Sequence, residues 1–352
     1  MDQINVGIIG FGYMGHHHYN KILATEGLRA YAVFDIDPAK LDEAETLGLK
    51  AYRSAESFLA DESIGLVQIC TSNETHAMYA CMALSAGKHV MAEKPVTMNL
   101  GELEEVIQCA RKNGKIFTVH QNRRWDADYL TVKNVVRSGG VGKVTTIQSS
   151  VFGERGVCFG WRADPEKGGG MLLDWGVHLI DQMIDLFPEE PVTSIHARML
   201  SVLTPAVDDY FELRLGFTLG TVAQITVGTF ALEKLSRWFV NGDKGTLKIE
   251  TFDPATGSLR RIRGDVKGFE SVSGQHTLGP SRTMAPLKAE HIECVGLPEV
   301  GELGGEYYRN LASCLAGREQ PHVAWSQMRR VMQIVDLARE SALSNQVLHV
   351  SI

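Results

Sequence analysis

"INVGIIGFGYMG", residues 4–15, decides the fold of the first part of this 352-residue chain. A short β-rich run leads directly into a G-x-G-x-x-G pattern, and residues 13–26 then read as a helix. In such a turn Gly10 allows the tight bend, Gly12 lets the backbone approach a pyrophosphate, and Gly15 lets helix and strand pack closely. The free N–H groups and partial positive charge of the helix N-terminus favour phosphate there.

A carboxylate follows where a dinucleotide site needs one. Asp35 ends the next predicted strand, 29–35, and lies 20 residues after Gly15. A carboxylate at this position binds ribose hydroxyls and repels a 2′-phosphate, so it favours NAD over NADP. The alternative is a solvated residue at a strand end. We expect cofactor contacts from Asp35 and from the turn itself, which comprises Gly10, Phe11, Gly12, Tyr13, Met14 and Gly15.

The rest of the first 121 residues alternates short apolar strands with helices. Further strands are predicted over 64–71, 88–94 and 115–121, and further helices over 38–48, 74–86 and 99–113. Strict alternation of this kind predicts a parallel sheet with helices on both faces. We therefore expect a Rossmann dinucleotide-binding domain over residues 1–121.

From residue 122 the pattern changes to longer strands with hairpin-like connections. Helices are predicted over 127–138, 171–187 and 323–343, and strands over 143–153, 192–202, 208–218, 221–231 and 236–250. This predicts a second α/β domain, residues 122–352, with a large, mainly antiparallel open sheet. Helices cover one face, the other is available to a partner subunit, and the C-terminal helix and tail can pack back on the first domain. Loops and short strands are expected over 254–300.

The bulk composition excludes several classes of partner. The formal net charge is -7 and no Lys/Arg cluster stands out, which argues against nucleic acid or an anionic membrane. No apolar run approaches the ~20 residues that span a bilayer, and the start does not resemble a signal peptide. The cysteines show no CxxC pair, which favours reduced thiols in the cytoplasm; they are Cys70, Cys81, Cys109, Cys158, Cys294 and Cys314.

Three consecutive histidines, 16–18, suggest a metal site at first sight. Successive residues of a helix point about 100° apart, so these side chains do not converge on one ion. We expect them on the helix surface or in contact with loops, and we predict no bound metal.

"AEKP", residues 92–95, ends a predicted strand of the first domain. Ligands of open α/β sheets bind at the carboxyl ends of the strands, so Lys94 is expected in the cofactor cleft. There it can hydrogen-bond a substrate hydroxyl and stabilise charge that develops on oxygen. The alternative is a surface lysine at a strand end.

"GGGMLLDWGVHLIDQ", residues 168–182, places a carboxylate and an imidazole four residues apart on a predicted helix. Oxidation of a secondary alcohol needs a base near neutral pH. His178 suits that role, and Asp174 at i-4 would orient it and stabilise the imidazolium. The glycines let this helix approach the cofactor closely. Two alternatives stay open: Asp181 pairs with His178 instead, or Asp174 caps the helix and His178 belongs to the core.

These motifs together, in this order, resemble the Gfo/Idh/MocA family of oxidoreductases over essentially the whole chain, including "EYYRNLASCLAG" at 306–317. "QNRRWDADY" (121–129) and "HLIDQMIDLF" (178–187) are most similar to scyllo-inositol dehydrogenase-type members. The resemblance implies that Lys94, Asp174 and His178 are catalytic. It also implies cofactor contacts from Thr71, Asn73, His76, Glu93, Lys94 and Asn122, and substrate contacts from Arg123, Trp161 and Arg162, besides the three catalytic residues.

The resulting hypothesis is an NAD-dependent dehydrogenase that oxidises a ring secondary alcohol of an inositol or sugar, as a homodimer or homotetramer. NADP stays possible because members with "NRRW" often use it. His178 accepts the hydroxyl proton, Asp174 orients it, and Lys94 polarises the oxygen. Two alternatives use the same cofactor site: redox-assisted glycoside cleavage with tightly bound NAD, and a non-catalytic NAD-binding sensor or regulatory protein.

Overall fold

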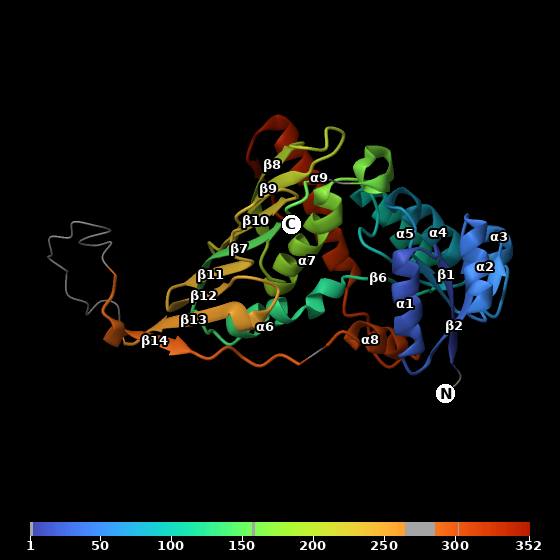
Figure 1. Cartoon of the computed structure of the whole chain (residues 1–352), viewed down its shortest axis with the longest axis horizontal. Helices are drawn as coiled ribbons and strands as arrows, with labels where there is room; N and C mark the ends of the chain where they lie inside the picture. The colour runs from blue at the N-terminus through green and yellow to red at the C-terminus, as the bar shows by residue number, and fades with distance from the viewer. Residues whose placement is uncertain (1–2, 157–158, 265–285, 302) are drawn as a thin grey trace.

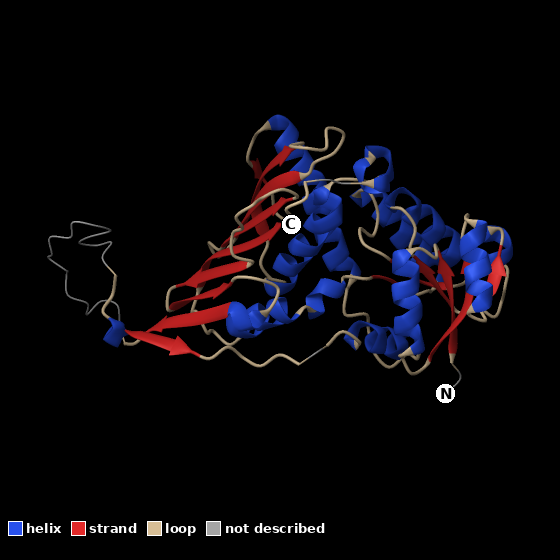
Figure 2. Cartoon of the chain, in the orientation of Figure 1, coloured by secondary structure: helices blue, strands red, loops and turns tan. Residues whose placement is uncertain are grey.

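The computed structural model describes residues 3–156, 159–264, 286–301 and 303–352. It contains two sheets with several helices between them (Figures 1 and 2). This architecture confirms the predicted fold class, a Rossmann-type sheet followed by a large, mainly antiparallel one. No helix within the described ranges combines the length and the apolar character that a bilayer crossing requires.

The first sheet has parallel strands throughout, in the order β3-β2-β1-β4-β5-β6. Its strands are β1 (Ile4–Ile9), β2 (Leu28–Phe34), β3 (Lys50–Tyr52), β4 (Leu66–Ile69), β5 (His89–Ala92) and β6 (Phe117–Val119). Its helices are α1 (Tyr13–Leu23), α2 (Pro38–Thr46), α3 (Ala55–Leu59), α4 (His76–Ser85) and α5 (Leu100–Asn113). Central strands such as β4 are buried along their whole length, as expected for a parallel sheet covered on both faces.

One strand of this sheet and one of the helices that accompany it were not predicted from the sequence. They are β3 and α3, which have 3 and 5 residues. Elements this short show too little periodicity to be read as strand or helix. They occupy the β2 edge of the sheet, away from the strand ends that follow β4, β5 and β6.

The second sheet has the order β14-β13-β12-β11-β7-β10-β9-β8-β15 in the described part of the chain. Every neighbouring pair is antiparallel except β7 and β10, which are parallel. The strands are β7 (Val144–Phe152), β8 (Val192–Leu200), β9 (Tyr210–Phe217), β10 (Val222–Gly228), β11 (Trp238–Gly242), β12 (Gly245–Ile249), β13 (Gly257–Ile262), β14 (Ile292–Val295) and β15 (Leu348–His349).

Helices α6 (Ala127–Arg137), α7 (Val177–Leu186) and α9 (Trp325–Ser344) cover one face of this sheet, and α7 and α9 lie between it and the first sheet (Figure 1). The strands alternate accordingly. On β9, Phe211 and Leu213 are buried under the helices, whereas Glu212 and Arg214 are exposed on the opposite face. Within the described ranges that opposite face has no helix over it (Figure 2).

The C-terminal helices bind to the first sheet as well as the second. In α9, Trp325 donates from its indole to the backbone oxygen of Phe117 at 2.9 Å, and Asp336 accepts from the backbone of Leu100 at 2.9 Å. Helix α8 (Glu306–Leu315) contacts α1 through Tyr308. The two sheets are therefore joined by the chain's last described helices as well as by the connection near residue 122.

Five cysteines are free thiols in this structure: Cys70, Cys81, Cys109, Cys294 and Cys314. Cys158, the sixth cysteine of the sequence, lies outside the described residues. The histidine prediction needs a correction at one position. His18 is completely buried rather than on the helix surface, because α8 closes over this side of α1.

Candidate active site

The site is formed where parallel strands of the first sheet end. Gly10 follows β1, Asp35 follows β2, Thr71 lies just beyond β4, and Lys94 and Gln121 lie just beyond β5 and β6. Carboxyl ends of parallel strands share one edge of a sheet, and the strand order reverses beside β1. That edge is the position where open α/β sheets bind their ligands.

The glycine turn has the geometry of a phosphate-binding turn. Gly10 has φ +89°, and an added Cβ would lie 2.8 Å from the backbone oxygen of Cys70. At Gly15 a Cβ would lie 2.4 Å from the oxygen of Gly10, so α1 packs directly on the turn. At Gly12 a Cβ would meet nothing within 4 Å. The space in front of the α1 N-terminus is thus open where a pyrophosphate must approach, and the turn fits a dinucleotide.

Asp35 is held beside this turn by backbone donors. Its carboxylate accepts from the N–H of Phe11 at 2.6 Å and from the N–H of Asp37 at 2.9 Å. These bonds place the acid next to the glycine turn, the position from which a carboxylate reaches the adenosine ribose. Tyr13 is 88 % exposed at the start of α1, with Met14 beside it. The cofactor contacts of these residues stay predictions.

Lys94 joins the two parts of the chain. Its ammonium donates to the Asp174 carboxylate and to the Asp174 backbone oxygen, both at 2.7 Å. The Nε of Arg162 lies 3.6 Å from the other carboxylate oxygen. Burial would raise the pKa of Asp174, but the charge and hydrogen bond of Lys94, with help from Arg162, outweigh burial and lower it. Asp174 is therefore ionised and anchors the lysine.

The predicted contact between Asp174 and His178 is wrong. Asp174 lies in a π-helical turn, Leu172–Gly176, that precedes α7, and the N–H of Val177 bonds to the oxygen of Leu172 five residues back. The Asp174 carboxylate is bound by Lys94 and lies near Arg162, whereas the imidazole of His178 has Gln121 as its partner. Within the described residues no hydrogen bond joins these two side chains.

His178 instead contacts the end of β6. Its Nδ1 lies 3.1 Å from the Oε1 of Gln121, and both side chains are buried. An amide oxygen only accepts, so Nδ1 carries the hydrogen and Nε2 keeps its lone pair. Burial lowers the pKa of His178 well below its ordinary value, and the positive charges of Lys94 and Arg123 lower it further. His178 is therefore a neutral imidazole with one acceptor nitrogen.

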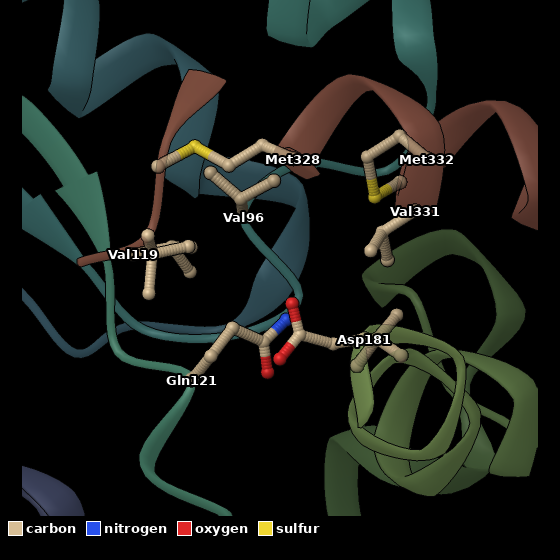
Figure 3. Close-up of a pocket in the computed structure, with 9 residues that line it drawn as sticks. Val96, Val119, Gln121, Asp181, Met328, Val331 and Met332 are labelled. Carbon is tan, nitrogen blue, oxygen red and sulfur yellow. The ribbon is translucent and has the colours of Figure 1, made fainter. Parts of the chain in front are cut away.

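The alternative prediction, in which Asp181 pairs with His178, is also wrong. Asp181 accepts from the Nε and Nη2 of Arg124 at 2.7 and 2.6 Å, in a buried bidentate pair. A cavity of about 10 Å³ lies between this pair and the first sheet, and Gln121 lines it. In Figure 3 the amide nitrogen of Gln121 points toward the Asp181 carboxylate across this cavity.

The predicted substrate residues gather around the same helix start. The Arg123 guanidinium lies 4.0 Å from the centre of the Trp175 ring and 5.7 Å from that of Phe252. Arg162 lies 4.3 Å from the ring centre of Trp161, next to Asp174. Trp175 stands beside His178, with 6.3 Å between the ring centres. The wall of the site is thus aromatic and cationic.

Two residues predicted to contact the cofactor, Asn73 and His76, also bond to other parts of the protein, and their cofactor contacts stay predictions. The amide of Asn73 donates to the oxygen of Gly168 at 2.8 Å and holds the glycine loop against the first sheet. His76 is buried between the oxygens of Pro95 and Thr71, at 2.8 and 3.1 Å. Both side chains position strand-end segments. Contacts of Thr71 with the cofactor stay predicted, as do those of Asn122, which follows Gln121.

The Glu93 carboxylate is buried against two histidines, and its predicted cofactor contact stays a prediction. One of its oxygens lies 2.6 Å from His18 Nε2 and 2.7 Å from His120 Nδ1, and His18 also bonds to the hydroxyl of Tyr308. Burial would raise the pKa of Glu93, but the two histidines hold it well below its ordinary value.

Ligand-type atoms of His18, Glu93 and His120 lie within 4.8 Å of one another, so these side chains are of the kind that can hold a metal ion. Their spacing of 2.6–2.7 Å is that of hydrogen bonds, each of which uses a hydrogen that a metal would displace. This cluster could not be predicted from the sequence, because its residues come from three separate segments: α1, the residue after β5 and the residue after β6.

A glycine turn of the dinucleotide-binding type, an acid bonded to that turn, and a lysine that follows a neighbouring strand are features of an NAD(P)-dependent oxidoreductase. Comparison with known proteins agrees. Residues 4–121 match the model of an oxidoreductase family with an NAD-binding Rossmann fold, and residues 129–248 match the GFO/IDH/MocA C-terminal domain. The chain belongs to the GFO/IDH/MocA family, which confirms the resemblance seen in its motifs.

Relatives match along the whole length. An uncharacterized oxidoreductase of Escherichia coli (strain K12), YhhX, is 34% identical over 351 residues, 98% of either chain. A scyllo-inositol 2-dehydrogenase (NADP(+)) of Bacillus subtilis (strain 168) is 26% identical over 97% of this chain and 94% of its own. The crystal structure of an NAD-binding protein from Listeria innocua superposes with a TM-score of 0.94 at 36% identity, covering 99% of this chain and 100% of that one.

Proposed function

We propose that this oxidoreductase is a dehydrogenase that oxidises a secondary alcohol on the ring of an inositol or sugar, with NAD preferred over NADP. The observation that carries the proposal is the convergence of Lys94 and His178, from the two parts of the chain, at the strand edge that bears the nucleotide turn. The inositol dehydrogenases among the relatives support the substrate class.

His178 is the proton acceptor in this proposal. Its Nδ1 is occupied by Gln121, and Nε2 holds a lone pair. Because burial and the nearby cations lower its pKa, the imidazole is in its accepting form at neutral pH. A hydroxyl hydrogen-bonded to Nε2 can therefore lose its proton there.

Lys94 polarises the oxygen of the same hydroxyl. An ammonium has three donors, and two of them are used by Asp174. The third is directed by this anchoring and is available to the substrate. A fixed ammonium stabilises negative charge as it develops on the oxygen. Asp174 acts on the lysine in this scheme, which revises its predicted role toward His178.

The nucleotide turn and Asp35 would hold the cofactor, which when bound supplies the hydride acceptor. The carboxylate repels a 2′-phosphate, and an exposed isoleucine, Ile36, follows it without adding positive charge. These features support NAD preference in this chain, although the Bacillus subtilis relative is described as NADP-dependent.

The test is a screen of inositols and sugars for NADH or NADPH formation, with each cofactor in turn. On the best substrate, His178→Ala should lower turnover by at least ~10²-fold and leave NAD affinity little changed. Undiminished turnover would remove His178 from the mechanism. Aglycone release from a glycoside without NADH accumulation would replace simple oxidation by redox-assisted cleavage.

Asp35→Ser tests the cofactor preference separately. Loss of the carboxylate should weaken NAD binding and narrow the difference between NAD and NADP. If the ratio of the two affinities is unaltered, Asp35 does not contact the ribose.

We also propose that the exposed face of the second sheet, which bears Glu212 and Arg214, joins subunits into a homodimer or homotetramer. Light scattering in solution measures this directly, and a monomer at all concentrations would contradict it.

A further inference from the structure

The group that fixes His178 comes from the first sheet, and not from the motif in which the histidine lies. Gln121 follows β6 and is 5 % exposed, and His178 at the start of α7 is 4 % exposed. The bond between them, 3.1 Å long, spans 57 residues of sequence. Because both side chains are buried, water does not substitute readily for either partner.

The orientation of the Gln121 amide is itself determined by its surroundings. Its nitrogen points toward the Asp181 carboxylate, as Figure 3 shows, and a carboxylate only accepts hydrogen bonds. Asp181 is in turn held by two bonds from Arg124. With the NH₂ group directed toward Asp181, the amide oxygen is directed at His178 Nδ1.

We propose that Gln121 is the positioning residue for the base: it holds His178 in the tautomer with hydrogen on Nδ1 and the lone pair on Nε2. This inference rests on the proposed function, in which Nε2 receives the proton. It assigns to a neutral amide the task that the Asp-x-x-x-His spacing suggested for Asp174.

A neutral partner and a carboxylate would affect the pKa of His178 differently. Four charged or titratable groups lie around His178. Lys94, Arg123 and His120 disfavour the imidazolium and lower the pKa of His178, whereas Glu93 favours the imidazolium and raises it. Asp174 is paired with Lys94, and Asp181 with Arg124. The amide oxygen adds no full negative charge, so the base stays in its accepting form to lower pH than an Asp–His pair would.

Two substitutions at Gln121 separate positioning from packing. Gln121→Leu keeps the volume but removes the acceptor, and kcat should fall roughly 10–100-fold with NAD affinity unchanged. Gln121→Glu restores an acceptor for Nδ1 but turns its second oxygen toward the Asp181 carboxylate, so it should recover part of that loss. Its charge stabilises the imidazolium and raises the pKa of His178, so the acidic limb of the kcat–pH profile should move to higher pH by about one unit or more. Gln108→Leu, on the exposed face of α5, is the matched control and should change neither quantity.

A merely structural role predicts another pattern, in which both variants lower the thermal unfolding temperature and leave the acidic limb in place. That pattern overturns the proposal, as does wild-type kcat in Gln121→Leu. Nitrogen NMR of histidine-labelled protein gives a readout that needs no substrate, with His178→Ala used to assign the signal. The wild type should show hydrogen on Nδ1, and Gln121→Leu should show a mixture of tautomers. A wild-type signal with hydrogen on Nε2 would refute the inference whether or not polyols are oxidised, whereas failure of the substrate screen alone refutes only the proposed function.

Discussion

Two glycines of the nucleotide turn should respond oppositely to the same added methyl group. At Gly12 the backbone has φ -79°, which any residue adopts, and an added Cβ meets no atom within 4 Å. Gly12→Ala should therefore change the free energy of unfolding by less than about 1 kcal/mol, the scale of a weakened helix cap. The methyl would occupy the space through which a pyrophosphate approaches α1.

The expected loss of NAD affinity follows from that position. Separating the phosphates from the α1 N-terminus forfeits on the order of 2 kcal/mol, which corresponds to roughly 30-fold weaker binding. At Gly15 the methyl would lie 2.4 Å from the oxygen of Gly10, a backbone atom that cannot rotate away. Gly15→Ala should cost about 1–3 kcal/mol of stability or more, because the helix must shift off the strand.

Calorimetric titration with NAD and thermal unfolding followed by circular dichroism measure the two effects separately. Gly12→Ala should bind NAD weakly and unfold near the wild-type temperature, and Gly15→Ala should unfold at a lower temperature. Wild-type NAD affinity in Gly12→Ala would refute the assignment of the turn. An equal loss of stability in both variants would refute the geometric distinction between the two glycines.

Three further outcomes are expected. Burial lowers the pKa of His18 to about 4, so as pH falls below 6.5 the unfolded chain binds this proton before the folded protein does. The free energy of unfolding should therefore decline by up to roughly 3 kcal/mol between pH 6.5 and pH 4. Glu93, whose pKa is lowered in the folded protein, adds to this loss below its ordinary pKa. Urea midpoints that stay level from pH 7 to 5 would contradict this. Arg124→Met leaves Asp181 buried without its bidentate partner and should cost about 3–5 kcal/mol in urea unfolding, whereas an unchanged midpoint would show the pair to be dispensable. Lys94→Met should lower kcat at least ~10²-fold while NAD affinity is kept, and a variant of wild-type kcat would exclude the lysine from the chemistry.

The sequence was most informative where function depends on local backbone. The turn from Gly10 to Gly15 and the acid at the end of β2 are adjacent to strands that sequence patterns identify, so their positions follow from strand order. Lys94 was found in the same way, as a charged residue just past an apolar strand. The hairpins of the second sheet were also visible, because turn residues separate alternating strands.

Pairings between distant segments could not be read in this way. Asp174 bonds to Lys94, which is 80 residues away in sequence, and no local pattern shows this partner, so a contact with the nearby His178 was expected. Gln121 stands at a strand end, which was a usable signal, but nothing local shows that its amide meets a histidine 57 residues later. His18 was expected on the helix surface or in contact with loops, because Tyr308, which covers it, is 290 residues away in sequence.

The lysine–aspartate bridge has an implication for engineering. Its ammonium belongs to one half of the chain and its carboxylate to the other, as do the two members of the Gln121–His178 bond and of the Asn73–Gly168 bond. A chimera that joins the nucleotide-binding half of a relative to the second half of this chain would keep that relative's complete nucleotide turn. Turnover would depend on matching side chains at these three contacts, and folding on the bonds that α8 and α9 make to the first half.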